Sequence, residues 1–231
     1  MNYLFNNFYK GKTVFVTGHT GFQGSWLSLW LTLLGANVVG YSLSPSTHPS
    51  LFESLKLQKK FTSKIGNINQ KDKLLSEMLK HDPDVVIHLA AQPLVRKSYD
   101  EPLETFSTNI LGTANLLESV RDTPSVQSCI IMTSDKAYEN KEWDYAYREN
   151  DSMGGHDPYS ASKGAAELIV SSYRRSFFNK TNSPGIASIR AGNVIGGGDW
   201  SEDRLIPDCI RSLQSNKKII VVGNGGSAAM A

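Results

Sequence analysis

The sequence predicts an α/β protein with a Rossmann-like, doubly wound parallel sheet. Short runs of β-branched and apolar residues alternate with longer segments whose apolar residues recur at helical spacing. A glycine-rich turn joins the first strand to the first helix. Strict alternation of strand and helix implies right-handed crossovers, and therefore one parallel sheet that helices cover on both faces.

The strands are predicted from short runs that are rich in valine and isoleucine. The first run, Thr13-Val14-Phe15-Val16-Thr17, is apolar without alternation, as expected for a strand buried on both faces of a parallel sheet. The predicted strands cover residues 13–17, 37–41, 84–89, 128–133 and 186–190, with a further strand just before Gly66.

The helices are predicted from apolar spacing and from residues that start or stop a helix. Gly35 follows the first helix, and Asp82-Pro83 ends the second, because the residue before a proline disfavours helical geometry. Pro102 suits the first turn of a long helix. The predicted helices cover residues 25–34, 71–81, 102–121 and 160–178.

The composition narrows the class of protein. The 231 residues carry 24 basic and 22 acidic side chains, and a net charge of +2 gives no reason to expect a nucleic-acid or anionic-membrane partner. The sequence begins without the features of a signal peptide, and its longest apolar helix candidate is too short to span a bilayer. Cys129 and Cys209 have neither metal-ligand nor disulfide-framework spacing. We expect a cytoplasmic protein without a metal site.

The turn after the first strand has the spacing of a dinucleotide-binding fingerprint. Its glycines allow a tight turn and let the backbone and the helix N–H groups approach a pyrophosphate. A glycine-rich turn without a ligand is the alternative, and the position between strand and helix favours the ligand. The candidate cofactor-binding residues of this turn are Gly18, His19, Gly21, Phe22, Gln23 and Gly24.

The end of the second strand leaves the choice between NAD and NADP open. Residues 41–44 contain neither the acid that usually binds the adenosine ribose nor an arginine for a 2′-phosphate. Asn67 and Ile68 follow the predicted third strand and are candidates for the adenine site, although Asn67 also suits an ordinary turn.

Tyr159 and Lys163 lie four residues apart, on one face of a predicted helix. A nearby ammonium favours the phenolate and is expected to lower the pKa of the tyrosine, which would make it a base for a hydroxyl proton. By itself such a pair is more often a surface pair, and its weight comes from its position after the fifth strand.

Two more segments end strands on the edge of the sheet where ligands bind. Ser134, Asp135 and Lys136 follow the fifth strand and offer a hydroxyl, a carboxylate and an amine for proton transfer, although a turn-capping role is the alternative. Leu89, Ala90 and Ala91 follow the fourth strand and would let a nicotinamide ribose lie close. His88 is interpreted as a core histidine.

Taken together, long segments of the sequence resemble the extended short-chain dehydrogenase/reductases, and among them the CDP-glucose 4,6-dehydratases. His19 and Lys136 distinguish this group from other sugar-nucleotide dehydratases, which usually carry alanine-like and glutamate residues there. The matching segments are Gly18-His19-Thr20-Gly21-Phe22, residues 90–96, Thr133-Ser134-Asp135-Lys136, residues 154–159 and residues 190–200.

The resemblance implies an NAD-dependent internal redox cycle on a nucleotide sugar, CDP-glucose. Tyr159, with Lys163 and Ser134, would remove the proton of the C4 hydroxyl while hydride passes to NAD. Lys136 would act as the base at C5 and Asp135 as the acid on the departing C6 hydroxyl, before hydride returns to C6. Burial is expected to lower the pKa of Lys136. The resemblance also implies that Gln92, Asn193 and Arg204 bind substrate.

The resemblance has further implications for organisation. Asn109 would support the active-site helix, and the helices from Pro102 and from Ser160 would pair with a second subunit in a homodimer or higher homo-oligomer. We expect an NAD-binding domain with the catalytic residues at 1–195 and the start of a substrate-binding region at 196–216, with most of that C-terminal lobe missing. Residues 217–231 resemble instead the first strand and phosphate loop of a phosphoheptose-isomerase-type domain.

Two alternatives remain open from the sequence. A non-catalytic dinucleotide-binding or dimerisation fragment would keep the glycine turn without turnover. A nucleotide-sugar 4-epimerase would share Tyr159 and Lys163, but would have no use for Asp135 and Lys136 in an elimination.

Overall fold

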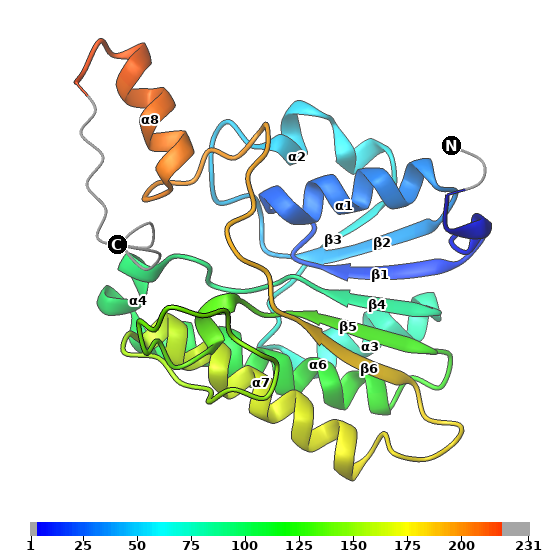
Figure 1. Ribbon diagram of the computed structural model, residues 1–231. Coiled ribbons are helices and arrows are strands. Elements are labelled where there is room, and N and C mark those ends of the chain that lie inside the picture. Colours follow the sequence, from blue (N-terminus) through cyan, green and yellow to red (C-terminus); the bar gives the residue numbers. More distant parts are fainter. Residues whose placement is uncertain (1–3, 219–231) are drawn as a thin grey trace.

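The computed structural model describes residues 4–218, which form one six-stranded parallel sheet (Figure 1). The strand order is β3-β2-β1-β4-β5-β6, so the direction of winding reverses between β1 and β4. This order confirms the predicted Rossmann-like fold, and ligands in such sheets bind beside this reversal, at the carboxyl ends of the strands. The strands are β1 (Thr13–Thr17), β2 (Asn37–Ser42), β3 (Thr62–Ile65), β4 (Val85–His88), β5 (Ser128–Met132) and β6 (Gly185–Ile189).

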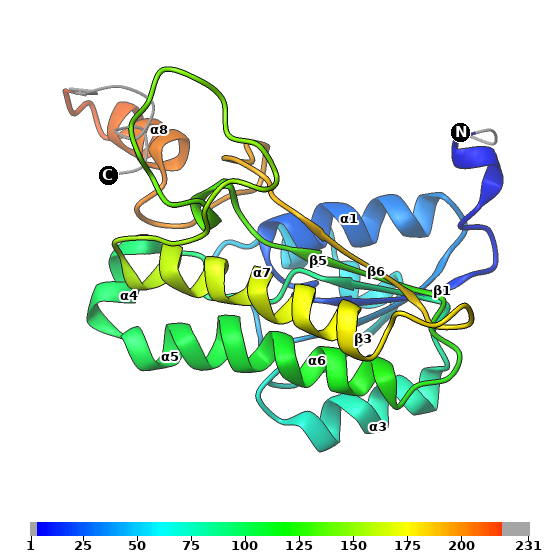
Figure 2. The same ribbon diagram turned by 60° about the horizontal axis from the view of Figure 1, so that its bottom comes forward.

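Helices cover the two faces of the sheet unequally, as Figure 2 shows. α1 and α2 lie on one face, and α3, α6 and α7 lie on the other. The helices are α1 (Phe22–Leu33), α2 (Leu51–Ser54), α3 (Lys71–His81), α4 (Val95–Asp100), α5 (Pro102–Phe106), α6 (Gly112–Arg121), α7 (Pro158–Ser176) and α8 (Leu205–Gln214).

Alternate residues of the buried strands pack into two separate hydrophobic cores, one on each face of the sheet. Val14 and Val16 of β1 pack with Leu31 of α1 on one face, whereas Phe15 between them packs with Leu74 of α3 and Leu116 of α6 on the other. Successive side chains of a strand point to opposite faces, so an unbroken apolar run is needed to supply both cores.

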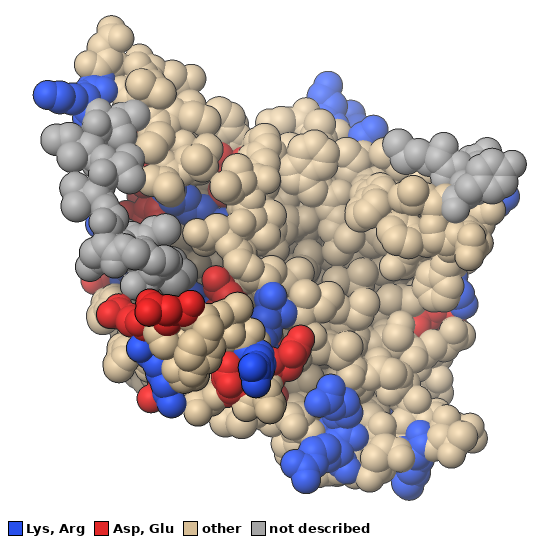
Figure 3. Space-filling model, viewed as in Figure 1, with Lys and Arg blue, Asp and Glu red and all other residues tan. Residues whose placement is uncertain are grey.

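The α1 face of the sheet is open beside β5 and β6. Ile189 of β6 is 44% exposed, and Trp30 and Leu33 of α1 are also exposed. On this side of the molecule the central surface is almost free of charged side chains, which gather below it (Figure 3). The predicted covering by helices therefore holds for the α3–α6–α7 face and, on the other face, for the strands from β3 to β4, where Val85 and Ile87 of β4 pack in the same core as Leu31 of α1.

The long helix predicted over 102–121 is interrupted. Residues Ser107–Leu111 form a wider, π-helical turn between α5 and α6. Asn109 in this turn is buried and bonds through its amide to both backbone groups of Gln92, at 2.8 Å from the Gln92 nitrogen and 3.1 Å from its oxygen. The turn therefore brings a polar side chain to the end of β4, which helical spacing alone does not reveal.

Other short elements lie outside the sequence prediction. α2 and α4 contain too few residues for apolar periodicity to show, and α8 follows the glycine-rich segment at 192–198. The expected isomerase-like strand and loop fall mainly on residues 219–231, outside the described part of the chain. Over residues 4–218, no helix combines the length and the apolar character needed to cross a membrane.

The fold buries two histidines without charge. His88 lies between Thr17 (2.6 Å) and Thr113 (3.3 Å), which confirms its interpretation as a core histidine, and His19 bonds to Ser63 at 2.7 Å. Burial lowers the pKa of His19 to about 4 and that of His88 to about 3.

The two buried histidines predict loss of stability in mild acid. Because their folded-state pKa values lie below the unfolded value near 6.5, the unfolded chain binds more protons as the pH falls below 6.5. The free energy of unfolding should fall by about 1.4 kcal/mol per pH unit for each histidine between pH 6 and 5. The two histidines together should give about 2.8 kcal/mol per pH unit, and urea titrations of His88→Asn should show half of that combined slope. The same slope in His88→Asn as in the parent chain would contradict the assignment, and exposed His48→Gln is the control.

Candidate functional site

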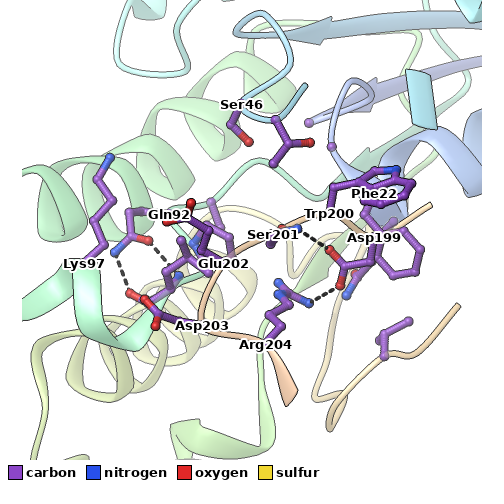
Figure 4. Close-up of a pocket in the computed structure, with 18 of the residues that line it drawn as sticks. Phe22, Ser46, Gln92, Lys97, Asp199, Trp200, Ser201, Glu202, Asp203 and Arg204 are labelled. Carbon is purple, nitrogen blue, oxygen red and sulfur yellow. Dashed lines mark hydrogen bonds and ion pairs between the residues drawn. The ribbon is translucent and has the colours of Figure 1, made fainter. Parts of the chain in front are cut away.

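A cleft runs along the carboxyl edge of the sheet, beside the reversal of strand order. Its volume is about 1880 Å³, above the roughly 300–1000 Å³ of a site for one small ligand. The ends of β1, β2, β4 and β5 form its floor, and residues 191–204 form one wall (Figure 4). This wall is held to α1, because the indole nitrogen of Trp26 donates to the carbonyl of Gly197 at 2.9 Å.

The glycine turn at one end of the cleft leaves no room for side chains. A Cβ on Gly24 would lie 2.0 Å from the carbonyl oxygen of Gly18, and one on Gly18 would lie 2.7 Å from the nitrogen of Ala90. Gly18 also has a φ of +76°. No side chain caps α1 after Gly21, so its first N–H groups face the cleft as an anion site.

The side chain of His19 points away from this cleft, so a contact of this residue with a cofactor would have to come from its backbone. Its ring is fully buried against Phe52 and Phe61 and bonds to Ser63. The ring also occupies the space beside Gly40, where a Cβ would lie 2.2 Å from it. His19 therefore supports the turn from below, while its neighbour Thr20 lines the cleft.

The cleft beside the end of β2 is lined by hydroxyl groups. Thr20 Oγ1 lies 2.6 Å from Ser42 Oγ, and Ser44 follows on the cleft surface. Asn67 and Ile68 line the same end, and the Asn67 side-chain oxygen accepts from the nitrogen of Asn69 at 2.9 Å, as in a turn. Asn67 therefore lines the cleft, as an adenine-binding residue would, and also makes the hydrogen bond of an ordinary turn.

The predicted reactive residues meet at the opposite side of the cleft floor. Ser134, Lys136, Tyr159 and Lys163 all line the cleft. The Lys163 ammonium donates to the carbonyl of Met132 at 3.5 Å and lies 5.9 Å from the centre of the Tyr159 ring. Leu89, Ala90 and Ala91 line the cleft between this group and the glycine turn.

Asp135 lies at the rim rather than in the cleft lining. Its side chain is exposed, and its carboxylate accepts from the hydroxyl of Ser134 at 3.0 Å. Ser134 in turn accepts from the backbone nitrogen of Lys136 at 3.2 Å. The hydroxyl and carboxylate of this segment are therefore coupled through one hydrogen bond.

Burial raises the pKa of Tyr159, which corrects the expectation that Lys163 lowers it. The Ser134 hydroxyl and the Arg204 guanidinium oppose the effect of burial but do not outweigh it. The reason is that the phenol is almost enclosed, and desolvation penalises the phenolate. The tyrosine is therefore a phenol at neutral pH in this structure.

Two lysines of the cleft, Lys163 and Lys136, are easier to deprotonate than an exposed lysine. Burial lowers the pKa of Lys163 to about 8, and the charge of Glu167 acts in the opposite direction. Burial also lowers the pKa of Lys136, against the charges of Asp157 and Asp135. For Lys136 the direction is the one that the sequence predicts.

The residues predicted to bind substrate differ in how their side chains are engaged. The Gln92 amide is occupied within its own loop: its nitrogen donates to Leu94 and Thr105, and its oxygen accepts from the Leu94 nitrogen at 2.7 Å. Gln92 therefore lines the cleft while its side-chain amide is engaged within its own loop, and its contact with substrate stays a prediction. Asn109, which bonds to Ser162 of α7 at 2.9 Å, does brace the helix as predicted.

The wall opposite this loop carries Asn193 and Arg204. Figure 4 shows Asp199 between Ser201 and Arg204, and the Arg204 guanidinium lies 3.5 Å from the Asp199 carboxylate. Asn193 is exposed on the cleft surface. The wall thus offers one cation and one amide toward the space above the reactive residues.

Two residues that the sequence prediction missed also shape the cleft. Asp157 caps α7 by accepting from the nitrogen of Ser160 at 2.9 Å, and it lines the cleft. The spacing Asp157-Pro158 before an apolar helical pattern is a start signal that could have revealed it. Thr20 lies between Gly18 and Gly21 of the glycine motif, and this position is the signal that could have revealed it.

Comparison with known proteins decides the family. The family model described as GDP-mannose 4,6 dehydratase matches residues 15–228. The chain belongs to this family. Over residues 4–218, no three His, Cys, Asp or Glu side chains are grouped to hold a metal ion.

Three individual proteins show how similar the relatives are. CDP-glucose 4,6-dehydratase of Salmonella typhimurium is 55% identical over 93% of this chain, which spans 61% of that protein. The dTDP-D-glucose 4,6-dehydratase of Dictyostelium discoideum is 32% identical over 93% of the chain and 51% of its own length. The structure of UDP-glucuronic acid 4-epimerase from Bacillus cereus, in complex with UDP-glucuronic acid and NAD, matches with a TM-score of 0.77 and 27% identity, over 92% of this chain and 66% of that one.

The close backbone approach at the glycine turn predicts a position-specific cost of a methyl group. Gly24→Ala should lower the free energy of unfolding by about 2–3 kcal/mol, although alanine favours a helix, because the methyl overlaps the Gly18 carbonyl. Gly197→Ala is the matched control in the same cleft, since its Cβ meets nothing within 4 Å. Equal stability of the two variants in urea denaturation would refute the packing argument.

Proposed function

We propose that this chain is a nucleotide-sugar 4,6-dehydratase that acts on CDP-glucose with NAD. The observation that carries the proposal is the assembly of Ser134, Lys136, Tyr159 and Lys163 in the lining of one cleft whose far end is the glycine turn. The 55% identity to a CDP-glucose 4,6-dehydratase supports the choice of substrate and of reaction.

The residues present fit a dinucleotide. Gly18 and Gly24 let the backbone of β1, α1 and the segment after β4 pack closer than any Cβ would allow, which keeps the turn tight, and the uncapped start of α1 supplies N–H groups for the pyrophosphate. Asn67 and Ile68 would border the adenine, and Leu89, Ala90 and Ala91 would lie along the nicotinamide ribose. When bound, NAD supplies a reversible acceptor for one hydride.

In the first half of the proposed reaction, Tyr159 takes the proton of the C4 hydroxyl. Ser134 bonds to the phenol and relays or stabilises the proton, and the buried ammonium of Lys163 offsets the negative charge that develops on the phenolate. Because burial raises the pKa of Tyr159, the phenol first passes its own proton through the Ser134 hydroxyl to the Asp135 carboxylate, and the resulting phenolate is a strong base for the C4 hydroxyl proton.

In the second half, the 4-ketone acidifies the hydrogen at C5, and the C6 hydroxyl must leave as water. Lys136 is half-buried with a lowered pKa, which increases its neutral, basic fraction, and we assign it the C5 proton. Asp135 sits at the rim, where its carboxyl group, protonated in the first half, would protonate the leaving hydroxyl. Lys136 would return its proton to C5 as the hydride returns to C6. Asn193 and Arg204 would hold the substrate phosphates on the opposite wall.

Organisation and location follow from the same proposal. Residues 1–195 hold the cofactor and the catalytic groups, and residues 196–216 begin the substrate-binding region. We infer a homodimer or higher homo-oligomer through α5, α6 and α7, where Leu103, Leu111 and Leu168 are between 59% and 81% exposed. A cytoplasmic location agrees with a buried free thiol at Cys129.

Incubation of the chain with CDP-glucose and NAD should give a 4-keto-6-deoxy sugar. The product is followed by its absorbance in alkali and identified by mass spectrometry as CDP-glucose less one water. Binding of NAD without any product would favour the non-catalytic alternative. Formation of an isomer of unchanged mass would favour the 4-epimerase.

Tyr159→Phe should lower kcat by about 10²- to 10⁴-fold, because the hydroxyl proton then has no acceptor. NAD affinity should change little, and Tyr173→Phe on the same helix is the control, since Tyr173 lies away from the cleft. A Tyr159→Phe variant with parent turnover would exclude the tyrosine as the base.

Lys136→Ala should stop loss of water while leaving oxidation at C4 possible. Reduced dinucleotide should then accumulate in a single turnover, and its near-ultraviolet absorbance measures it. Lys141→Ala, in the same loop and exposed, is the control. Parent rates of water loss in Lys136→Ala would remove the lysine from the elimination.

A further inference from the structure

Glu167 is a buried carboxylate that the proposed reaction does not use. It lies on α7, one helical turn after Lys163, and is only 6% exposed. One of its oxygens accepts from Thr133 Oγ1 at 2.5 Å, and the other accepts from Ser188 Oγ at 2.9 Å and from Arg190 at 3.1 Å. A single side chain thus ties α7 to the ends of both β5 and β6.

Arg190 extends the same network to residues 138–149. Its second terminal nitrogen donates to the Tyr138 hydroxyl at 2.8 Å and to the Glu149 carbonyl at 2.9 Å. Its guanidinium also lies over the Tyr138 ring, 4.8 Å from the ring centre. The Glu167–Arg190 pair therefore holds α7, the sheet edge and the 138–149 segment in one arrangement.

The network begins next to the reactive groups at both ends. Thr133 directly precedes Ser134, and Lys163 lies one turn before Glu167, so a change at the carboxylate reaches both the hydroxyl and the ammonium. Burial raises the pKa of Glu167, but bonds from Arg190, Thr133 and Ser188 outweigh it, so the carboxylate stays ionised. Its charge in turn favours the ammonium form of Lys163.

We propose that Glu167, paired with Arg190, is a positioning residue for the dehydration. It fixes α7 against the end of β5, which sets Tyr159 and Lys163 relative to Ser134, and it supplies the negative charge that keeps Lys163 an ammonium in a buried place. The proposal rests on the proposed function for its kinetic consequences, while its electrostatic part concerns the chain alone.

Other groups around Lys163 act in the same or the opposite sense. His88 of β4 faces it and is kept neutral by burial and by the lysine charge, the carbonyl of Met132 accepts a hydrogen bond from its ammonium, and Tyr159 shares its helix face. Asp135, Asp157 and Arg204 act on Tyr159 instead. Glu167 is thus the carboxylate that acts on Lys163 among the described residues.

Glu167→Gln keeps the size of the side chain and removes its charge. We expect kcat to fall about 10- to 100-fold, with KM changed less than about threefold. The basic limb of the plot of kcat against pH, which reports loss of the Lys163 ammonium, should move to lower pH by about one unit. Glu167→Asp restores the charge at a shorter reach, so the limb should return while kcat recovers only in part. Glu118→Gln, which breaks an arginine pair on α6, is the control.

Thr133→Val separates geometry from charge. It removes the tie to β5 and leaves the Glu167–Arg190 pair, so kcat should fall while the basic limb stays in place. A limb that moves equally in Thr133→Val and Glu167→Gln would overturn the division of roles. Should Glu167→Gln fail to fold, the kcat and pH profiles of Glu167→Asp and Thr133→Val still test whether Glu167 acts through geometry and through charge.

A titration of the chain alone distinguishes this proposal from the proposed function. The side-chain ε-methylene resonance of Lys163, assigned through Lys163→Arg, should titrate near pH 8 in the parent chain and about one unit lower in Glu167→Gln. An unchanged titration would overturn the inference even if the parent chain is an active dehydratase. A shifted titration in a chain without turnover would uphold the electrostatic part of the inference while the proposed function fails.

Discussion

Lys163 is buried with its ammonium group against the end of β5, and the site depends on how this charge is compensated. Removal of an ammonium from water costs several kcal/mol unless nearby groups replace the lost solvation. Here the carbonyl of Met132 accepts one hydrogen bond, and Glu167 supplies a negative charge one turn away. These partners come from β5 and α7, so compensation of the charge also fixes the helix that carries Tyr159.

The opposite end of the cleft depends on close packing of the backbone rather than on charge. Gly18 and Gly24 bring β1, α1 and the segment after β4 nearer than any side chain would allow. The reversal of strand order then places this turn and the ends of β4 and β5 along one edge of the sheet. A phosphate-binding turn and a proton-transferring group are consequently held by one rigid scaffold.

Much of this arrangement could be predicted because the local pattern is strong. Most of the strands could be predicted from apolar runs, although β3 (Thr62–Ile65) is largely polar, and α3 spans the residues that its leucine spacing and Asp82-Pro83 indicate. The π-helical turn at Asn109 could not be predicted, because its cause is a tertiary bond to Gln92 that no local pattern records. The direction of the pKa shift at Tyr159 was wrong because a spacing of four residues shows a nearby charge but not how deeply the phenol is buried. For the same reason the sequence suggested contacts with ligand for His19 and Gln92, whose side chains are occupied inside the fold.

The fate of the C4 hydrogen tests the central claim most directly. The account requires that the hydride removed from C4 beside Tyr159 returns to C6 of the same sugar. The chain is incubated with NAD and CDP-glucose that carries deuterium at C4, and the product is examined by NMR and mass spectrometry. The account predicts a 4-keto-6-deoxy sugar with the deuterium at C6. Deuterium that stays at C4 in a product of unchanged mass, or that is lost to water, would contradict it.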